Sequence, residues 1–330
     1  AYLYSDQVAM PTIANTDFLF LPALTHKVYL PLVGSNIDTS LTPTTILTPT
    51  LPDTGQVTDY TPTFGEDADY SINPPAYTVN GNGTVSDQVT GFMWQQGDGG
   101  EMTYANAITY CQNLSLGGYT DWQLPDPYQL YGILNHDRLP ALNSTAFTPT
   151  SAEYWWSANT QVNDSSKVWV VNSGGGTGPH PMSETISAGG NKSYNTRCVR
   201  NATTRAANAL TTNGNGTVTD SNSGLIWQQA EVTPTLTWEG ALNYREALSL
   251  GGQTDWRLPN IKEIQSLVDI THLNPAIDTT YFPDALPALY WSSTTQFGHA
   301  AAAWFADFTD GRTSYEDKTT SLPVRCVRSN

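Results

Sequence analysis

Charged side chains are scarce in this sequence, and most of those present are acidic. Only 13% of the 330 residues are Asp, Glu, Lys or Arg, whereas typical soluble proteins contain about 25%. The 14 basic and 30 acidic residues give a net charge of -16. Nucleic acids and anionic membranes are therefore poor partners, because their phosphates would be repelled. Neutral glycans and divalent cations remain possible partners.

Long hydrophobic runs are also missing. The most apolar stretch, residues 18–33, contains two prolines and the polar pair His26 and Lys27, so it is too short and too broken to span a bilayer. The chain begins at Ala1 without a Met, as it would after removal of a signal peptide. We therefore expect an extracellular or cell-surface protein without a membrane span.

What the sequence does contain is an internal duplication, with motifs that recur in the same order. The recurring motifs are Asn-Gly-Asn-Gly-Thr-Val at 80–85 and 213–218, Trp-Gln-Gln at 94–96 and 227–229, Thr-Asp-Trp-x-Leu-Pro at 120–125 and 254–259, Trp-Ser at 156–157 and 291–292, and Arg-Cys-Val-Arg at 197–200 and 325–328. A repeat of this length is a whole domain. We expect two copies, residues 61–205 and 206–330, behind a different segment, residues 1–60.

The N-terminal segment contains two short β-prone runs and then a Thr/Pro-rich stretch over residues 37–62. Such a stretch favours extended conformations and cannot build a core. Apolar β runs on an extended tether are what strand addition to the open sheet edge of a neighbouring subunit requires. The residues predicted to form this assembly strand are Phe18, Phe20, Val28, Leu30 and Leu32.

Each copy is predicted to begin with a hairpin turn at Asn-Gly and a strand through residues 92–94 or 225–227. Two helices and then further strands follow. Thr103 and Thr237 can cap the first helix, because apolar residues then recur every three or four positions. In the second copy, Asn260 followed by Glu263 is typical of the N-terminus of another helix. The strands are expected at 154–160, 168–171 and 196–200 in the first copy, and at 290–295, 304–308 and 324–328 in the second.

There are only three cysteines, Cys111, Cys198 and Cys326. Cys111 and Cys198 lie in the same copy, so the simplest pairing is one disulfide between them. Cys326 corresponds to Cys198, but Arg245 stands where its partner would be. Cys326 is then a free thiol, either buried and inert or available for an intermolecular disulfide or other reaction.

The succession of motifs resembles a bacterial extracellular family, once a domain of unknown function, that includes the C-terminal domain of a collagen-like adhesin. The resemblance covers residues 60–330 and leaves the N-terminal segment uncovered. It implies an α+β fold similar to C-type lectins, with two helices on a short irregular antiparallel sheet and the first helix joined to the last strand by a disulfide. It also implies adhesion or glycan binding, although the net charge speaks against a sulfated polysaccharide.

Loops that differ between the copies are where ligands are expected. The candidate aromatic residues for stacking on a glycan are Trp155, Tyr194, Phe297 and Tyr315. Calcium takes six to eight oxygen ligands, and the candidate calcium residues are Asp307, Asp310, Glu316 and Asp317. We otherwise expect no cofactor. No catalytic residue or further metal site is predicted, because the repeated Asp-Trp pairs are better explained as framework and the histidines are scattered.

These observations favour a secreted, non-enzymatic structural or adhesive protein, and the first hypothesis is a filament or surface-assembly subunit that binds other copies of itself by N-terminal strand addition. The alternative is a monomeric adhesin that binds a glycan on a host or neighbouring surface. A hydrolase or oxidase on the same fold is the third hypothesis.

Overall fold

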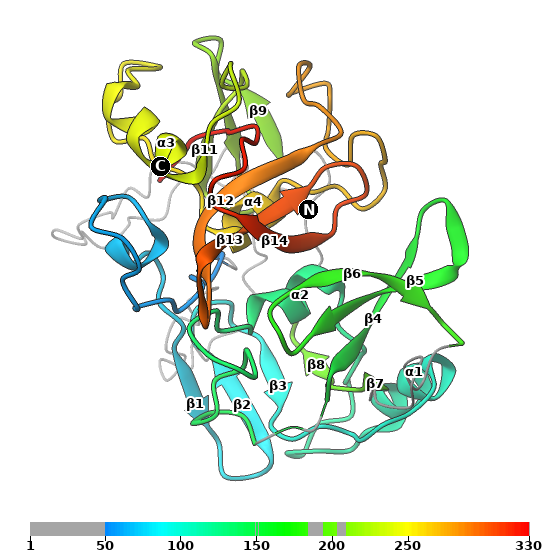
Figure 1. Ribbon diagram of the computed structural model, residues 1–330. Helices are drawn as coiled ribbons and strands as arrows, with labels where there is room; N and C mark the ends of the chain where they lie inside the picture. Colours follow the sequence, from blue (N-terminus) through cyan, green and yellow to red (C-terminus); the bar gives the residue numbers. More distant parts are fainter. Residues whose placement is uncertain (1–49, 149, 151, 184–193, 203–208, 330) are drawn as a thin grey trace, which may run out of the picture. The chain divides into compact units, whose positions relative to one another are not determined.

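Two sheets form in each repeat (Figure 1). The computed structural model describes residues 50–148, 150, 152–183, 194–202 and 209–329, to which all structural statements refer. The predicted assembly strand, with Phe18, Phe20, Val28, Leu30 and Leu32, lies outside the described residues. Within the described part, every helix is too short or too polar to cross a membrane.

In the first repeat, one sheet has the strand order β1-β2-β3-β8 and the other has the order β6-β5-β4-β7. All pairs are antiparallel except β4 and β7. The elements are β1 (Tyr77–Val79), β2 (Thr84–Asp87), β3 (Met93–Gln95), α1 (Tyr104–Asn113), α2 (Pro127–Gly132), β4 (Tyr154–Gln161), β5 (Asp164–Asn172), β6 (Thr177–Pro181), β7 (Tyr194–Asn195) and β8 (Val199–Arg200).

The second repeat has the same plan, with sheets β15-β11-β10-β9 and β12-β13-β14. Its elements are β9 (Leu210–Thr212), β10 (Thr217–Asp220), β11 (Leu225–Gln228), α3 (Trp238–Tyr244), the 3-10 turn η2 (Arg245–Ala247), α4 (Ile261–Ser266), β12 (Leu289–Gln296), β13 (His299–Asp307), β14 (Thr313–Asp317) and β15 (Val327–Ser329). In both repeats the last strand returns to pair with β3 or β11.

The expected α+β, C-type-lectin-like class is wrong, because the described residues form mainly β structure. Strands account for 32% and helices for 13% of the described residues. The helices are short, with 10 residues in α1 and 6 in α2, whereas β4 and β5 have 8 and 9 residues. The apolar spacing identified the buried helix faces but not the helix lengths. In the second repeat, for example, α3 ends at Tyr244 and the chain continues as η2.

The predicted helix starts are confirmed. The side chains of Thr103 and Thr237 accept hydrogen bonds from the backbone N–H groups three residues later. Asn260 and Glu263 form a reciprocal capping box, and Asp126 forms another with Gln129 at α2. Each cap satisfies a donor that would otherwise have no partner in the first turn.

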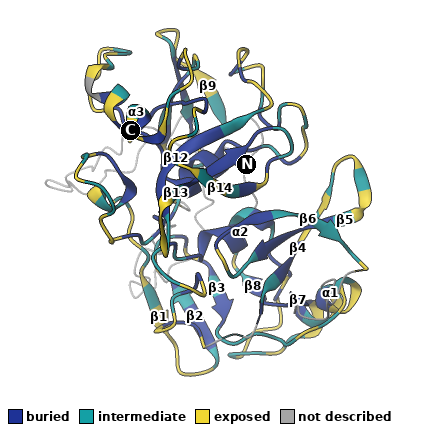
Figure 2. Ribbon diagram, in the orientation of Figure 1, coloured by how far each residue is buried: buried dark blue, intermediate teal, exposed yellow. Residues whose placement is uncertain are grey.

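One hydrophobic cluster extends through both repeats and includes Leu130 of α2, Ile264 of α4 and Trp304 of β13. Figure 2 shows how the buried residues concentrate in the strands and in α2. Two smaller clusters each stay within one repeat. Across the junction, the Tyr128 hydroxyl donates to the Val268 carbonyl oxygen at 2.7 Å. The repeats therefore share part of their core.

The lead-in segment, residues 50–73, precedes the first repeat but bonds extensively to the second. Gln56 makes two hydrogen bonds with the backbone of Thr295, at 2.8 and 3.0 Å. Thr294 donates to Asp67 at 2.6 Å. The Lys262 ammonium group donates to Asp53 O at 2.8 Å and, at the same time, to Gly132 O at 2.7 Å. The lead-in segment thus connects the two repeats through buried polar contacts.

Candidate functional site

A cleft of about 360 Å³, here called the inter-repeat cleft, lies where β13 and β14 meet β4, β5 and the loop before β6. The first repeat contributes six lining residues and the second contributes five: Leu139, Glu153, Tyr154, Asn172, Gly174 and Gly176, then Gln296, Trp304, Thr313, Ser314 and Tyr315. Apart from the two glycines, their side chains are aromatic, aliphatic, amide, hydroxyl and carboxylate groups, with no basic group among them.

The glycines of residues 174–176 allow the first repeat to approach the second closely. Gly175 has a positive φ of 108°, and a Cβ there would lie 3.0 Å from the Trp304 ring. A Cβ on Gly176 would lie 2.8 Å from the Asn172 side chain. The backbone N–H of Thr177 then donates to the Thr313 hydroxyl at 3.0 Å, which joins β6 to β14. This contact holds the two sides of the cleft together.

Tyr315 provides the aromatic surface of the cleft. Its side chain is 46% exposed, and its ring meets the buried Trp304 ring edge-on, with centroids 5.7 Å apart. Trp304 in turn packs edge-on against His136 of the first repeat at 5.5 Å. On the opposite side, the Tyr154 ring stacks on Tyr194 at 5.0 Å. Such paired rings are held in place by packing.

Two polar groups of the cleft lining have no hydrogen-bond partner among the described residues. The side-chain oxygen Oε1 of Gln296 is buried without a hydrogen-bond partner among the described residues. The Glu153 carboxylate likewise has no hydrogen bond or ion pair in that part of the chain, and it is the only charged side chain in the lining. The Gln296 oxygen is shielded from solvent, so Glu153 is the polar group of the two that a ligand can reach.

The other predicted stacking residues are placed elsewhere. Trp155 is 1% exposed and its ring N–H donates to Asp98 at 3.0 Å, while Tyr194 is fully buried and stacks on Trp156 at 4.5 Å. Both expectations need correction, because a buried ring cannot stack on a ligand. Phe297 lies in the turn between β12 and β13 and is only partly exposed. Of the four predicted stacking residues, only Tyr315 lines the cleft.

The four candidate calcium residues do not come together. Asp307 and Asp310 lie at the turn between β13 and β14, where Arg312 contacts both carboxylates at 3.5 and 2.9 Å. Asp317 is at the other end of β14, opposite Ala302, next to Glu316. Among the described residues, no three His, Cys, Asp or Glu side chains are close enough to hold a metal ion. Arg312 was not among the residues predicted from the sequence, although it forms ion pairs with both Asp307 and Asp310.

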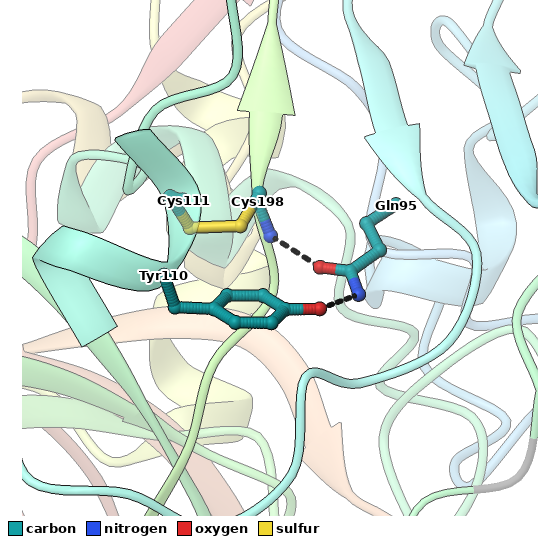
Figure 3. The surroundings of a disulfide bond; sticks show 4 residues. All are labelled: Gln95, Tyr110, Cys111 and Cys198. Carbon is teal, nitrogen blue, oxygen red and sulfur yellow. Dashed lines mark hydrogen bonds between the residues drawn. A yellow bond between two sulfur atoms is a disulfide. The ribbon is translucent and has the colours of Figure 1, made fainter. Parts of the chain in front are cut away.

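The expected disulfide between Cys111 and Cys198 is present, with a Cα–Cα distance of 5.5 Å. Figure 3 shows the Gln95 amide beside it, accepting from Cys198 N at 3.3 Å and donating to the Tyr110 hydroxyl at 2.7 Å. In the second repeat, Cys326 is a free and fully buried thiol. Burial raises the pKa of Cys326 to about 12, which disfavours the reactive thiolate.

The repeated Asp-Trp pairs have structural partners. Asp121 forms an ion pair with Arg200, and Asp255 forms the same pair with Arg328, both at 2.8 Å. The hydrogen bonds from Arg200 hold the pKa of Asp121 below its usual range. The neighbouring Trp122 is buried, and its ring N–H donates to backbone carbonyls. These contacts give the Asp-Trp pairs the structural role that was expected of them. The inter-repeat cleft is therefore the candidate site.

The fold defines a class of protein that is mainly β, is built from two tandem repeats and has a disulfide in one of them. A family model described as the Lcl C-terminal domain matches residues 83–200 and again residues 216–328. Because the two matches cover more than half of the chain, the protein belongs to this family, and the resemblance seen in the motifs is confirmed. The family is associated with adhesins, which makes this an adhesin-related protein of extracellular type. A comparison with curated proteins gave no match.

Proposed function

We propose that this adhesin-related protein binds a neutral glycan in the inter-repeat cleft. The main support is Tyr315, whose exposed ring is held edge-on against the buried Trp304. A sugar ring can stack on an aromatic face, and a face that is already fixed loses little conformational freedom on binding. Glu153 lies in the same lining, and its carboxylate can accept hydrogen bonds from sugar hydroxyls.

A neutral glycan fits this cleft better than a sulfated one. The eleven lining residues include one carboxylate, Glu153, and no lysine or arginine. The whole chain carries a net charge of -16, so a sulfated chain would be repelled at long range and would meet no cation at the site.

The protein is proposed to bind the glycan without hydrolysing it. Hydrolysis of a glycosidic bond normally uses two carboxyl groups about 5 to 10 Å apart. Glu153 is the only carboxylate in the lining, so the cleft offers a contact group but lacks the acid–base pair.

The test is a screen of neutral and sulfated oligosaccharides against the full chain, followed by titration calorimetry on the best neutral binder. Tyr315→Ala should weaken that binding at least tenfold, because it removes the stacking face. Glu153→Gln should weaken it less, since an amide still accepts a hydrogen bond. Tyr119→Ala is the matched control: this tyrosine is also exposed, at 38%, but lies outside the cleft lining.

Several results would count against the proposal. Equal losses in Tyr315→Ala and Tyr119→Ala would place binding outside the cleft. Binding of sulfated chains alone would contradict the charge argument. If no oligosaccharide bound, or if Tyr315→Ala bound as tightly as the unchanged protein, the cleft would not be a glycan site.

A further inference from the structure

Strands β4 and β12 occupy the same place in the two repeats, with the same register. Trp156 pairs with Val170 and Thr160 with Val168, and an irregularity lies between the two pairs. In the second repeat, Trp291 pairs with Phe305 and Thr295 with Ala303 around the same irregularity. The backbone N–H after the shared Trp-Ser also has the same partner in each repeat, Pro125 O or Pro259 O, at 2.8 Å in both. The ends of the two strands are therefore equivalent edges.

In the second repeat this edge is covered by the lead-in segment. Thr295 N donates to the Gln56 side chain at 3.0 Å, and Thr295 O accepts from it at 2.8 Å. Both groups thus point away from β13, toward the edge. Thr294 and Thr295 are fully buried. The extended lead-in segment supplies, from the same chain, the partner that a sheet edge needs.

In the first repeat the same edge is open only beyond Ala158, whose N–H donates to Pro125 O and whose carbonyl oxygen accepts from the Tyr104 hydroxyl at 3.2 Å. Ala158 and Thr160 are exposed, where their counterparts Ser293 and Thr295 are buried. By the shared register, Thr160 N and O hold the positions at which Thr295 bonds Gln56. No described residue outside the sheet bonds to these Thr160 groups. An exposed edge of this kind can pair with an added extended segment.

We propose that the open β4 edge, residues 159–161, accepts the apolar run at residues 18–33 of a second copy of this chain. That run is rich in the β-branched and aromatic residues that favour strands. Residues 37–49, between this run and the lead-in segment, are rich in Thr and Pro, a composition that favours extended conformations. Each copy then gives one segment and accepts another, a head-to-tail contact that forms a filament unless the rotation closes a ring.

The first experiment compares the size of the full chain and its variants by sedimentation velocity and negative-stain microscopy. The full chain should form filaments or rings, and Thr160→Pro should leave single particles, because proline removes the edge N–H and blocks pairing. Val79→Pro is the matched control: Val79 is the exposed end of another edge strand, β1, and this variant should still assemble. A full chain that is monomeric at all concentrations would overturn the proposal. Assembly lost in Val79→Pro and kept in Thr160→Pro would move the acceptor to β1.

A second experiment covers the case in which Thr160→Pro fails to fold. Chains carrying Phe20→Cys and chains carrying Thr160→Cys are mixed and treated with a flexible bismaleimide. Because Cys326 is buried and the other two cysteines are paired, a covalent dimer that appears only in the mixture shows contact between copies. Absence of that dimer would reject the proposal. If a chain carrying both changes linked only internally, the segment would belong to its own copy and the proposal would again fail.

Discussion

Asp67 in the lead-in segment is a fully enclosed carboxyl group. Its Oδ2 accepts hydrogen bonds from the hydroxyls of Thr54 and Thr294, at 2.7 and 2.6 Å. Burial raises the pKa of Asp67 to about 8; the nearby Asp53 carboxylate raises it further, while the hydrogen bonds from the two hydroxyls act in the opposite direction. The neighbouring Glu66 shares the same trend, with burial raising its pKa to about 7. Both acids therefore keep a proton in the folded protein at pH values where the unfolded chain has lost it.

The stability of the protein is accordingly expected to fall as pH rises from 5 to 7.5, because these two acids outweigh the opposite contribution of buried His136, whose pKa burial lowers to about 3. Stabilisation from a raised carboxyl pKa is complete below the unfolded value, near 4, and is lost as pH passes through the folded value. One such group changes the unfolding free energy by at most about 1.4 kcal/mol per pH unit. Urea unfolding at both pH values should show the drop in the unchanged protein and a smaller drop in Asp67→Asn, which cannot ionise.

The control for this pH effect is Asp121→Asn, since Arg200 lowers the pKa of that exposed carboxyl. It should keep the full drop in stability between pH 5 and 7.5. If Asp67→Asn kept the full drop as well, Asp67 would not be the responsible group.

At the scale of elements, the first helix of each repeat is held by a different kind of contact at the same position. In the first repeat, Cys111 of α1 is bonded to Cys198. In the second, Arg245 of η2 replaces the helix cysteine and binds the lead-in segment. Its guanidinium group donates to the Tyr70 hydroxyl at 3.1 Å and to Phe64 O at 2.9 Å, and lies 4.6 Å from the centre of the Phe64 ring. The missing disulfide is thus replaced by a polar contact to another segment.

Arg245→Ala is expected to destabilise the protein by about 2 to 4 kcal/mol, because it removes hydrogen bonds from a charged donor and a contact with an aromatic ring. Urea unfolding measures this loss. Lys167→Ala is the comparison: Lys167 forms an ion pair with Asp164, both side chains are more than a third exposed, and such surface pairs are worth at most about 1 kcal/mol. Equal losses in the two variants would show that the contact with the lead-in segment adds nothing.

Local sequence patterns predicted elements better than they predicted the site. The duplication, the caps at Thr103 and Asn260, and the disulfide all depend on short spacings or on direct comparison of the copies. The exposure of individual side chains was harder to predict. Tyr194 and Tyr315 are both aromatic residues in β strands, but Tyr194 faces the core and Tyr315 faces the cleft. Which face of a strand is buried depends on the neighbouring elements. The cleft itself joins Tyr154 to Tyr315 through packing of the two repeats, which no local pattern encodes.

For the whole molecule, the shared core implies that the two repeats unfold together. The cluster that contains Leu130 of the first repeat also contains Ile264 of the second, and the lead-in segment bonds to both repeats. Opening one repeat would expose apolar surface of the other and break buried hydrogen bonds to Asp53 and Gln56. Cooperative units of this kind share one unfolding free energy.

Leu130→Ala is therefore expected to destabilise both repeats, although the change lies in the first. Leu130 is buried, and such truncations cost about 2 to 5 kcal/mol. Hydrogen exchange measured by mass spectrometry at increasing denaturant gives separate unfolding midpoints for peptides from β2 and from β10. In the unchanged protein the two midpoints should coincide, and Leu130→Ala should lower both by the same amount. Midpoints for β10 that stay fixed while those for β2 fall would mean that the repeats are independent, and the inter-repeat cleft would then depend on a junction that can open without unfolding either repeat.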